Sequence, residues 1–205
     1  MDSILGSVGN VRLLRLLAEH GGPLSVAQLA RDSGMSGVGV RAALAGLARQ
    51  GLVSTFGQAR AQLHALNPSH PFAESLKAFF AQEQAHWQAL MRDLRGALAR
   101  FESVKAAWLY GSAARGEDKP GSDLDIALVV EGDLATTTSA VQEAMQALED
   151  RYHVPISVVA LSPQQILARA DHDPWWTDVV RDGQSLKTAA PQRYVAQLRR
   201  SAAPV

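Results

Sequence analysis

The sequence contains no cysteine, carries no net charge and has no long uninterrupted apolar stretch. The absence of cysteine excludes disulfides and thiolate zinc sites and is compatible with a reducing cytoplasm. The first residues lack the basic region and apolar run of a signal peptide, and no segment reaches membrane-spanning length. We therefore expect a soluble, cytoplasmic protein with no membrane partner. Its 205 residues suffice for one large domain or two small ones.

The charges are unevenly distributed although they sum to zero. Residues 1–67 hold six arginines and three acidic residues, whereas residues 108–190 hold six basic and thirteen acidic residues. A mildly basic front suits a polyanion, and an acidic rear suits a metal-nucleotide complex. Ordinary surface variation is the alternative explanation for the small basic excess.

The front of the chain predicts three helices. The apolar spacing from Val8 to His20 predicts the first helix. Ser25 and Gln28 have the spacing of a capping box, which opens the second helix. Ser36 is placed to cap a third helix that ends at Gly51.

A hairpin follows these helices. Residues 52–56 and 60–66 predict two strands joined by a turn at residues 57–58. The order of helices and hairpin resembles that of bacterial winged helix-turn-helix regulators across about residues 5–67. We accordingly assign residues 1–67 to a winged helix-turn-helix domain.

The resemblance implies that double-stranded DNA is a partner. The third helix of such domains enters the major groove, where its first residues meet base edges. Other polar side chains contact phosphates, which gives affinity and register without sequence choice. The candidate DNA-binding residues are Ser36, Arg41, Arg49, Gln58 and Arg60. The alternative is that the domain is a protein–protein module.

Residues 68–103 predict one long helix. Large apolar residues recur at spacings of three and four for about thirty residues after Pro71, which we place in the first helical turn. A helix of this length exceeds what one small domain needs. We expect it to link two domains and to pair with its twin in a homodimer, although a role in an intramolecular core is equally compatible.

The central motif is an apolar strand, a loop and an acidic strand. Residues 106–110 predict the first strand, and residues 123–130 predict the second. Because strand side chains alternate between faces, Asp123 and Asp125 share one face while Leu124 points into the core. The repulsion between two neighbouring carboxylates is ordinarily relieved by a divalent cation.

The loop between these strands opens with Gly111 and Ser112. Glycine lets the backbone approach a phosphate closely, and the serine hydroxyl and loop amides can donate hydrogen bonds to its oxygens. Together with the two acids, these residues predict a site for a nucleoside triphosphate and Mg²⁺.

This motif, Gly-Ser followed after ten residues by Asp-x-Asp, resembles that of the DNA polymerase beta-type nucleotidyltransferases, in particular their minimal branch. The resemblance implies that Asp123 and Asp125 are the catalytic and metal-binding residues and that the cation is Mg²⁺ or Mn²⁺. It also implies nucleotide contacts from Arg115 and Ser122, with ATP as the expected nucleotide. Lys119 lies in the same loop and could equally be a solvated charge.

The resemblance implies a third carboxylate on a later strand, and Ser157 occupies that position. A serine hydroxyl is a weak metal ligand and a poor base, while two-metal phosphoryl transfer depends on charge around both reacting oxygens. Nucleotide binding is therefore better supported than transfer.

The remaining sequence completes a small α/β domain, assigned to residues 104–190. A helix over residues 134–152 and a strand over residues 156–161 are predicted, and the residues around Asp173 predict a capped, packed turn beside two tryptophans. Residues 191–205 predict a basic tail or one more short helix.

The predicted fold class is α+β, with a winged helix-turn-helix, a long linking helix and a nucleotidyltransferase-like domain with a mixed sheet. Three functions stay open: a DNA-binding transcriptional regulator that binds a metal-nucleotide complex, an enzyme that transfers a nucleoside monophosphate to a protein or small molecule, and an antitoxin-like module that binds a partner protein.

Overall fold

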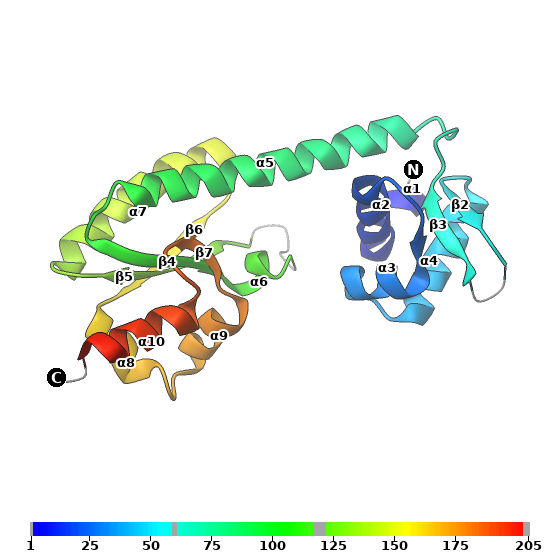
Figure 1. The fold of residues 1–205 in the computed structure, drawn as a ribbon. Helices are drawn as coiled ribbons and strands as arrows, with labels where there is room; N and C mark the ends of the chain where they lie inside the picture. Colours follow the sequence, from blue (N-terminus) through cyan, green and yellow to red (C-terminus); the bar gives the residue numbers. More distant parts are fainter. Residues whose placement is uncertain (1, 59–60, 117–121, 203–205) are drawn as a thin grey trace. The chain divides into compact units, whose positions relative to one another are not determined.

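The structure, a computed structural model, describes residues 2–58, 61–116 and 122–202 (Figure 1). The chain divides into two compact units, Met1–Trp87 and Gln88–Val205. The boundary falls inside one long helix, so each unit contains part of that helix.

The N-terminal unit combines helices with a three-stranded antiparallel sheet of order β1-β3-β2. Its elements are α1 (Asp2–Leu5), α2 (Val8–His20), β1 (Leu24–Ser25), α3 (Val26–Ser33), α4 (Gly37–Arg49), β2 (Val53–Phe56) and β3 (Leu63–Leu66). The three predicted helices and the hairpin are confirmed. The sequence pattern missed α1 and β1, because elements this short show no measurable periodicity.

The caps of α3 and α4 agree with the sequence. The Ser25 hydroxyl accepts a hydrogen bond from the Gln28 N–H at 3.2 Å, and the Gln28 side chain accepts one from the Ser25 N–H at 3.0 Å. The Ser36 hydroxyl accepts from the Gly39 N–H at 3.1 Å. Inward-facing leucines pack the helices against one another in a common core. The fully buried ones include Leu13, Leu14, Leu17, Leu29, Leu47 and Leu52.

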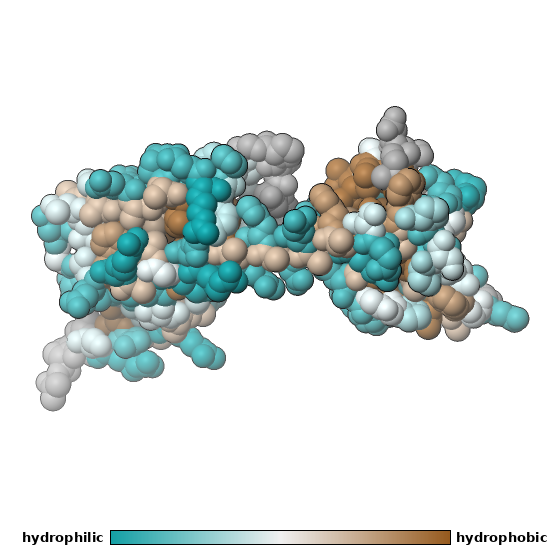
Figure 2. All heavy atoms as spheres, turned by 90° about the horizontal axis from the view of Figure 1, so that it is seen from above, coloured by the Kyte–Doolittle hydropathy of each residue, from teal (hydrophilic) through white to brown (hydrophobic). Residues whose placement is uncertain are grey.

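The long helix is α5, Ala73–Ala99. Its first part buries Leu76 and Phe80 in the core of the N-terminal unit. Residues 81–86 are all exposed, and Figure 2 shows mainly hydrophilic and weakly apolar residues along the middle of this helix. The sequence placed Pro71 in the first turn of this helix, but the helix starts later, at Ala73. A turn precedes it, in which the Ala73 N–H donates to the His70 carbonyl.

The C-terminal unit contains a four-stranded mixed sheet of order β6-β5-β4-β7, in which β5 and β6 are parallel and the other pairs antiparallel. The elements that follow α5 are β4 (Val104–Tyr110), α6 (Gly111–Ala114), β5 (Leu124–Val130), α7 (Leu134–Tyr152), β6 (Ile156–Leu161), α8 (Pro163–Arg169), α9 (Pro174–Asp182), β7 (Gln184–Lys187) and α10 (Pro191–Ala202). The mixed sheet and the long helix confirm the predicted α+β class.

Helices cover both faces of this sheet, with α7 and the end of α5 on one face and α8, α9 and α10 on the other (Figure 1). On the second face, the Trp108 ring packs edge-on against Trp176 and Tyr194, with ring centroids 5.7 and 5.6 Å apart. The Trp108 indole N–H also donates to the Ala189 carbonyl at 2.8 Å. Strand β4 therefore anchors the C-terminal helices.

Two parts of the C-terminal unit take their form from contacts with residues remote in sequence. The residues around Leu186 form an edge strand, β7, whose partner β4 is remote in sequence. Of the two forms expected for residues 191–205, a basic tail and a helix, the described residues 191–202 form the helix, because Tyr194 and Val195 are buried in the core. Within the described ranges, none of the helices has both the length and the apolar character that a membrane crossing requires.

Candidate functional site

The two motif carboxylates lie where β5 begins. Asp123 directly precedes the strand and is exposed, and Asp125 is its second residue and is half-buried. Asp125 is paired with Tyr110 on antiparallel β4 and with Ser157 on parallel β6. Since side chains alternate along strands, Asp125 lies on the face covered by α8, α9 and α10, whereas the Leu124 side chain is buried on the other face, as predicted.

Gly111 lies directly against the Asp125 carboxylate. A Cβ atom at Gly111 would lie 2.6 Å from Asp125 Oδ2, and the backbone φ of Gly111 is +77°. Both the close contact and the left-handed φ favour glycine at this position. The sequence predicted glycine here for the approach of a phosphate, and the structure adds the contact with the carboxylate.

The segment after Gly111 is a short helix and not the loop expected from sequence. The Arg115 N–H closes α6 by donating to the Ser112 carbonyl at 3.2 Å. The two alanines that follow Ser112 are good helix formers, which favours this turn over an open loop. Ser112 and Ser122, at the two ends of the connection, are both half-buried. Lys119 lies outside the described residues.

The electrostatics of the site are those of crowded negative charge. Burial raises the pKa of Asp125, and the neighbouring Asp123 charge raises it further. Burial likewise raises the pKa of Tyr110, with further contributions from the charges of Asp125, Asp123 and Asp178, while a hydrogen bond from Trp175 opposes the rise. A cation at this position would relieve the repulsion.

The two aspartates supply hard oxygen ligands that fit Mg²⁺ or Mn²⁺. Ser157, at the position of the expected third carboxylate, is the direct register partner of Asp125. Among the described residues, no three His, Asp, Glu or Cys side chains gather closely enough to hold a metal ion. The site thus has a pair of acids where the resemblance implied three.

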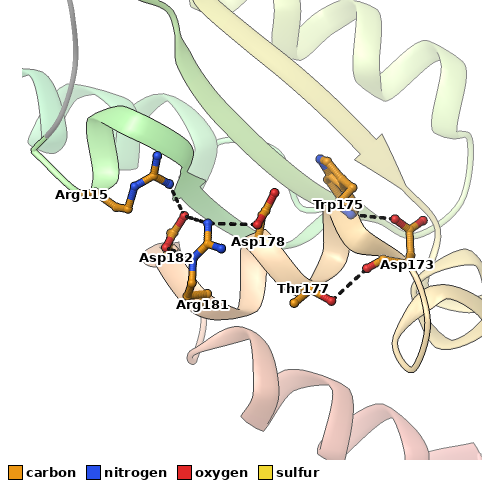
Figure 3. A network of polar contacts seen from close by, with 7 residues as sticks. All are labelled: Arg115, Asp173, Trp175, Thr177, Asp178, Arg181 and Asp182. Carbon is orange, nitrogen blue, oxygen red and sulfur yellow. Dashed lines mark hydrogen bonds and ion pairs between the residues drawn. The ribbon is translucent and has the colours of Figure 1, made fainter.

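Arg115 is bound to another part of the domain. Its guanidinium forms an ion pair with Asp182 at the end of α9, and the side chain of Asp182 is only 3% exposed. Arg181 also donates to Asp182, at 2.8 Å, and forms a second ion pair with Asp178 at 2.9 Å (Figure 3). The Arg115 side chain is therefore held at the junction of α6 and α9.

Helix α9 lies beside the acid pair, which sequence reasoning did not predict. The Trp175 indole N–H donates to the Tyr110 hydroxyl at 2.8 Å, and Tyr110 is the register partner of Asp125. Gln184, the first residue of β7 and two positions after the end of α9, donates to the Ala114 carbonyl of α6 at 2.6 Å. The sequence signal was limited to Asp173 beside the two tryptophans, which indicated a capped, packed turn but not where in the fold that turn lies.

The candidate DNA-binding residues lie on α4 and on the hairpin. Ser36 caps α4, and Arg41 is exposed with its guanidinium 3.3 Å from the Gly37 carbonyl. Arg49 and Gln58 are exposed at the end of α4 and after β2. Arg60 lies outside the described residues.

A groove of about 930 Å³ runs between α3, α4 and the hairpin. Arg41 and Gln62 line it together with small residues of the two helices, which include Ala27, Ala30 and Ala45. The exposed face of α4 is thus bordered by a concave surface with few bulky side chains.

Comparison with known families agrees with the two units. Residues 93–171 match the family model described as polymerase beta, nucleotidyltransferase, and residues 11–55 match that of the IclR helix-turn-helix domain. The chain therefore combines a helix-turn-helix DNA-binding domain with a polymerase beta-type nucleotidyltransferase domain, and the predicted resemblance is confirmed. A comparison with curated proteins gives no match.

Among solved structures, the chain is similar to a toxin-antitoxin with AMP-PNP, at 18% identity and a TM-score of 0.39 over 54% of this chain and 85% of that one. Two variants of the toxin-antitoxin MntA-HpeT are also similar. One has 18% identity and a TM-score of 0.40 over 54% and 85% of the two chains. The other has 18% identity and a TM-score of 0.35 over 58% and 84%.

Proposed function

We propose that this protein is a DNA-binding transcriptional regulator whose nucleotidyltransferase domain binds a nucleoside triphosphate with a divalent cation. Nucleotide binding is supported by the contact between Gly111 and the carboxylate of Asp125, whose register partner on β6 is Ser157. The helix-turn-helix match supports the DNA half. The expected nucleotide is ATP, and the expected cation is Mg²⁺ or Mn²⁺.

Asp123 and Asp125 would hold the cation. Their mutual repulsion and the burial of Asp125 disfavour two free negative charges. Two carboxylates leave coordination positions for phosphate oxygens and water, as Mg²⁺ prefers. When bound, the cation would neutralise charge on the phosphates. Gly111 gives the phosphates close access to the backbone, and the hydroxyls of Ser112 and Ser122 are groups that can donate hydrogen bonds to phosphate oxygens.

Ser157 favours binding over transfer. Its hydroxyl is neutral and cannot act as the base that a third carboxylate would provide. We therefore expect nucleotide binding to be retained while transfer is slow or absent. The second candidate, an active enzyme that transfers a nucleoside monophosphate to a protein or small molecule, is favoured by the intact motif residues Gly111, Ser112, Asp123 and Asp125.

Nucleotide binding is tested by calorimetric titration of the full-length protein with MgATP. Asp123→Asn should weaken binding at least tenfold, because it removes one of two charged ligands. Asp150→Asn is the matched control, since Asp150 is an exposed carboxylate on α7 of the same unit. Equal affinity of the two variants would overturn the proposed site.

Transfer is tested separately with labelled ATP, Mg²⁺ and candidate protein acceptors. We expect no label transfer by the natural chain, and a gain of transfer in Ser157→Asp, which restores a carboxylate beside Asp125. Rapid transfer by the natural chain would support the active enzyme and not the regulator that only binds the nucleotide.

DNA binding is tested by promoter-fragment shifts over a salt series. Arg41→Ala should weaken binding, and if Arg41 contacts a phosphate it should also reduce the salt slope by about one. Arg92→Ala, an exposed arginine of the other unit, is the control. No shift at any salt concentration would favour the protein-binding module. Sedimentation of the complex tests the proposed homodimer, which would bind two half-sites.

A further inference from the structure

Trp175 is the feature near the acid pair for which the nucleotidyltransferase motif gives no role. It lies in the first turn of α9, outside the residues 93–171 that match the family model. Its backbone N–H donates to the Asp173 carboxylate at 2.9 Å, and its indole N–H donates to the Tyr110 hydroxyl at 2.8 Å. These two hydrogen bonds fix both the backbone and the ring of Trp175.

The partner of this ring connects it to the acid pair. Tyr110 is adjacent in sequence to Gly111 and in register with Asp125. The rings of Tyr110 and Trp175 meet edge to face, with centroids 5.8 Å apart and planes at 86°. The indole therefore lies one aromatic ring away from the residues proposed to hold the cation and the phosphates. The charges of Asp123 and Asp125 act on the same Tyr110 hydroxyl, which agrees with this proximity.

Trp175 differs from its aromatic neighbours in exposure. Trp108 and Trp176 are 0% and 2% exposed, whereas Trp175 is only partly buried. The Trp175 ring packs against the core only in part, with its centroid 6.0 Å from that of Trp176. Nucleobases stack on partly exposed aromatic side chains, and they do so with any base because every base has a π-face.

We propose that Trp175 is the stacking surface for the base of the bound nucleoside triphosphate, which rests on the proposed nucleotide site. The cation and phosphates lie at Asp123, Asp125 and Gly111, and the base lies against the indole that Tyr110 orients. A stacked base makes a larger contact when it is a purine, so the site prefers purine over pyrimidine nucleotides. Helix α9 thereby adds base affinity to a site whose acids recognise only the charged part of the ligand.

The test compares two probes on the full-length protein: MgATP and the magnesium complex of inorganic triphosphate. Trp175→Ala should weaken MgATP binding about tenfold or more, as expected for loss of one stacked base, and leave triphosphate binding unchanged. Trp175→Phe keeps an aromatic ring at the site, so its affinity for MgATP should lie between those of the natural chain and of Trp175→Ala. This second variant keeps the test valid if the alanine variant does not fold.

Tryptophan fluorescence gives an independent measurement on the natural chain. MgATP should quench the emission and inorganic triphosphate should not, and the quench should persist in Trp87→Phe, on α5, but disappear in Trp175→Phe. If the Trp175 variants lose affinity equally for MgATP and for inorganic triphosphate, or if both probes quench the emission, the proposed stacking role of Trp175 is overturned. The proposal of a phosphate site would still stand. If the natural chain binds neither probe, the proposed nucleotide function fails as well.

Discussion

Substitution of Gly111 by alanine tests the most constrained contact of the site. Two effects add: the φ of +77° places an L-residue in the left-handed region, and the new Cβ would lie 2.6 Å from Asp125 Oδ2. The left-handed conformation disfavours alanine by about 1–2 kcal/mol, which its smaller unfolded-state entropy offsets by roughly 0.4–1 kcal/mol. The shift of the Asp125 carboxylate away from the new Cβ costs about 1–3 kcal/mol more. We expect the free energy of unfolding to fall by about 1–5 kcal/mol in total.

The matched control is Gly116→Ala. Gly116 has a similar φ of +67°, but a Cβ there would meet no atom within 4 Å. This variant should lose only about 1 kcal/mol, because it has the backbone effect without the overlap. The difference between the two variants therefore isolates the displacement of the Asp125 carboxylate.

Urea unfolding followed by tryptophan emission measures both variants, since Trp108, Trp175 and Trp176 all lie in the C-terminal unit. MgATP titration then shows whether Gly111→Ala loses affinity while Gly116→Ala retains it. Equal stability and equal affinity of the two variants would refute the argument that Gly111 and Asp125 form one contact.

Three further predictions concern stability. The Arg181 guanidinium, with a smaller contribution from Arg115, holds the pKa of Asp182 below its usual range, although burial acts in the opposite direction. The stabilisation by the Asp182 carboxylate is thus present above the unfolded-state pKa, near 4, and is lost as the pH falls through the lower folded-state pKa. Acid unfolding curves should show Asp182→Asn less stable than the natural chain at pH 7 and less sensitive to acid; parallel curves would contradict this. Ser36→Ala removes the cap of α4 and should destabilise the N-terminal unit by about 1 kcal/mol in urea unfolding followed by circular dichroism, and an unchanged midpoint would count against the cap. Leu47→Ala, at a side chain that is 0% exposed, should destabilise the same unit by about 2–5 kcal/mol, and a much smaller loss would show that the core closes around the cavity.

Local signals were sufficient for most of the secondary structure. The bounds of α2, α7 and β6 agree with the sequence prediction, because each element combines a clear apolar period with a glycine, proline or capping residue at its ends. The loop expected after Tyr110 was wrong in part, because the helix propensity of the two alanines after Ser112 closes a helical turn there.

The sequence by itself determined the order of the two domains, the helix-turn-helix caps and the acidic strand after a glycine, because these depend on neighbours within a few residues. Only the tertiary structure decided that Asp125 lies against Gly111 and beside Ser157, and that α9 brings Trp175 to Tyr110 and Asp182 to Arg115. These contacts join residues up to 67 positions apart. Strand pairing and helix packing set such distances, and no local spacing encodes them.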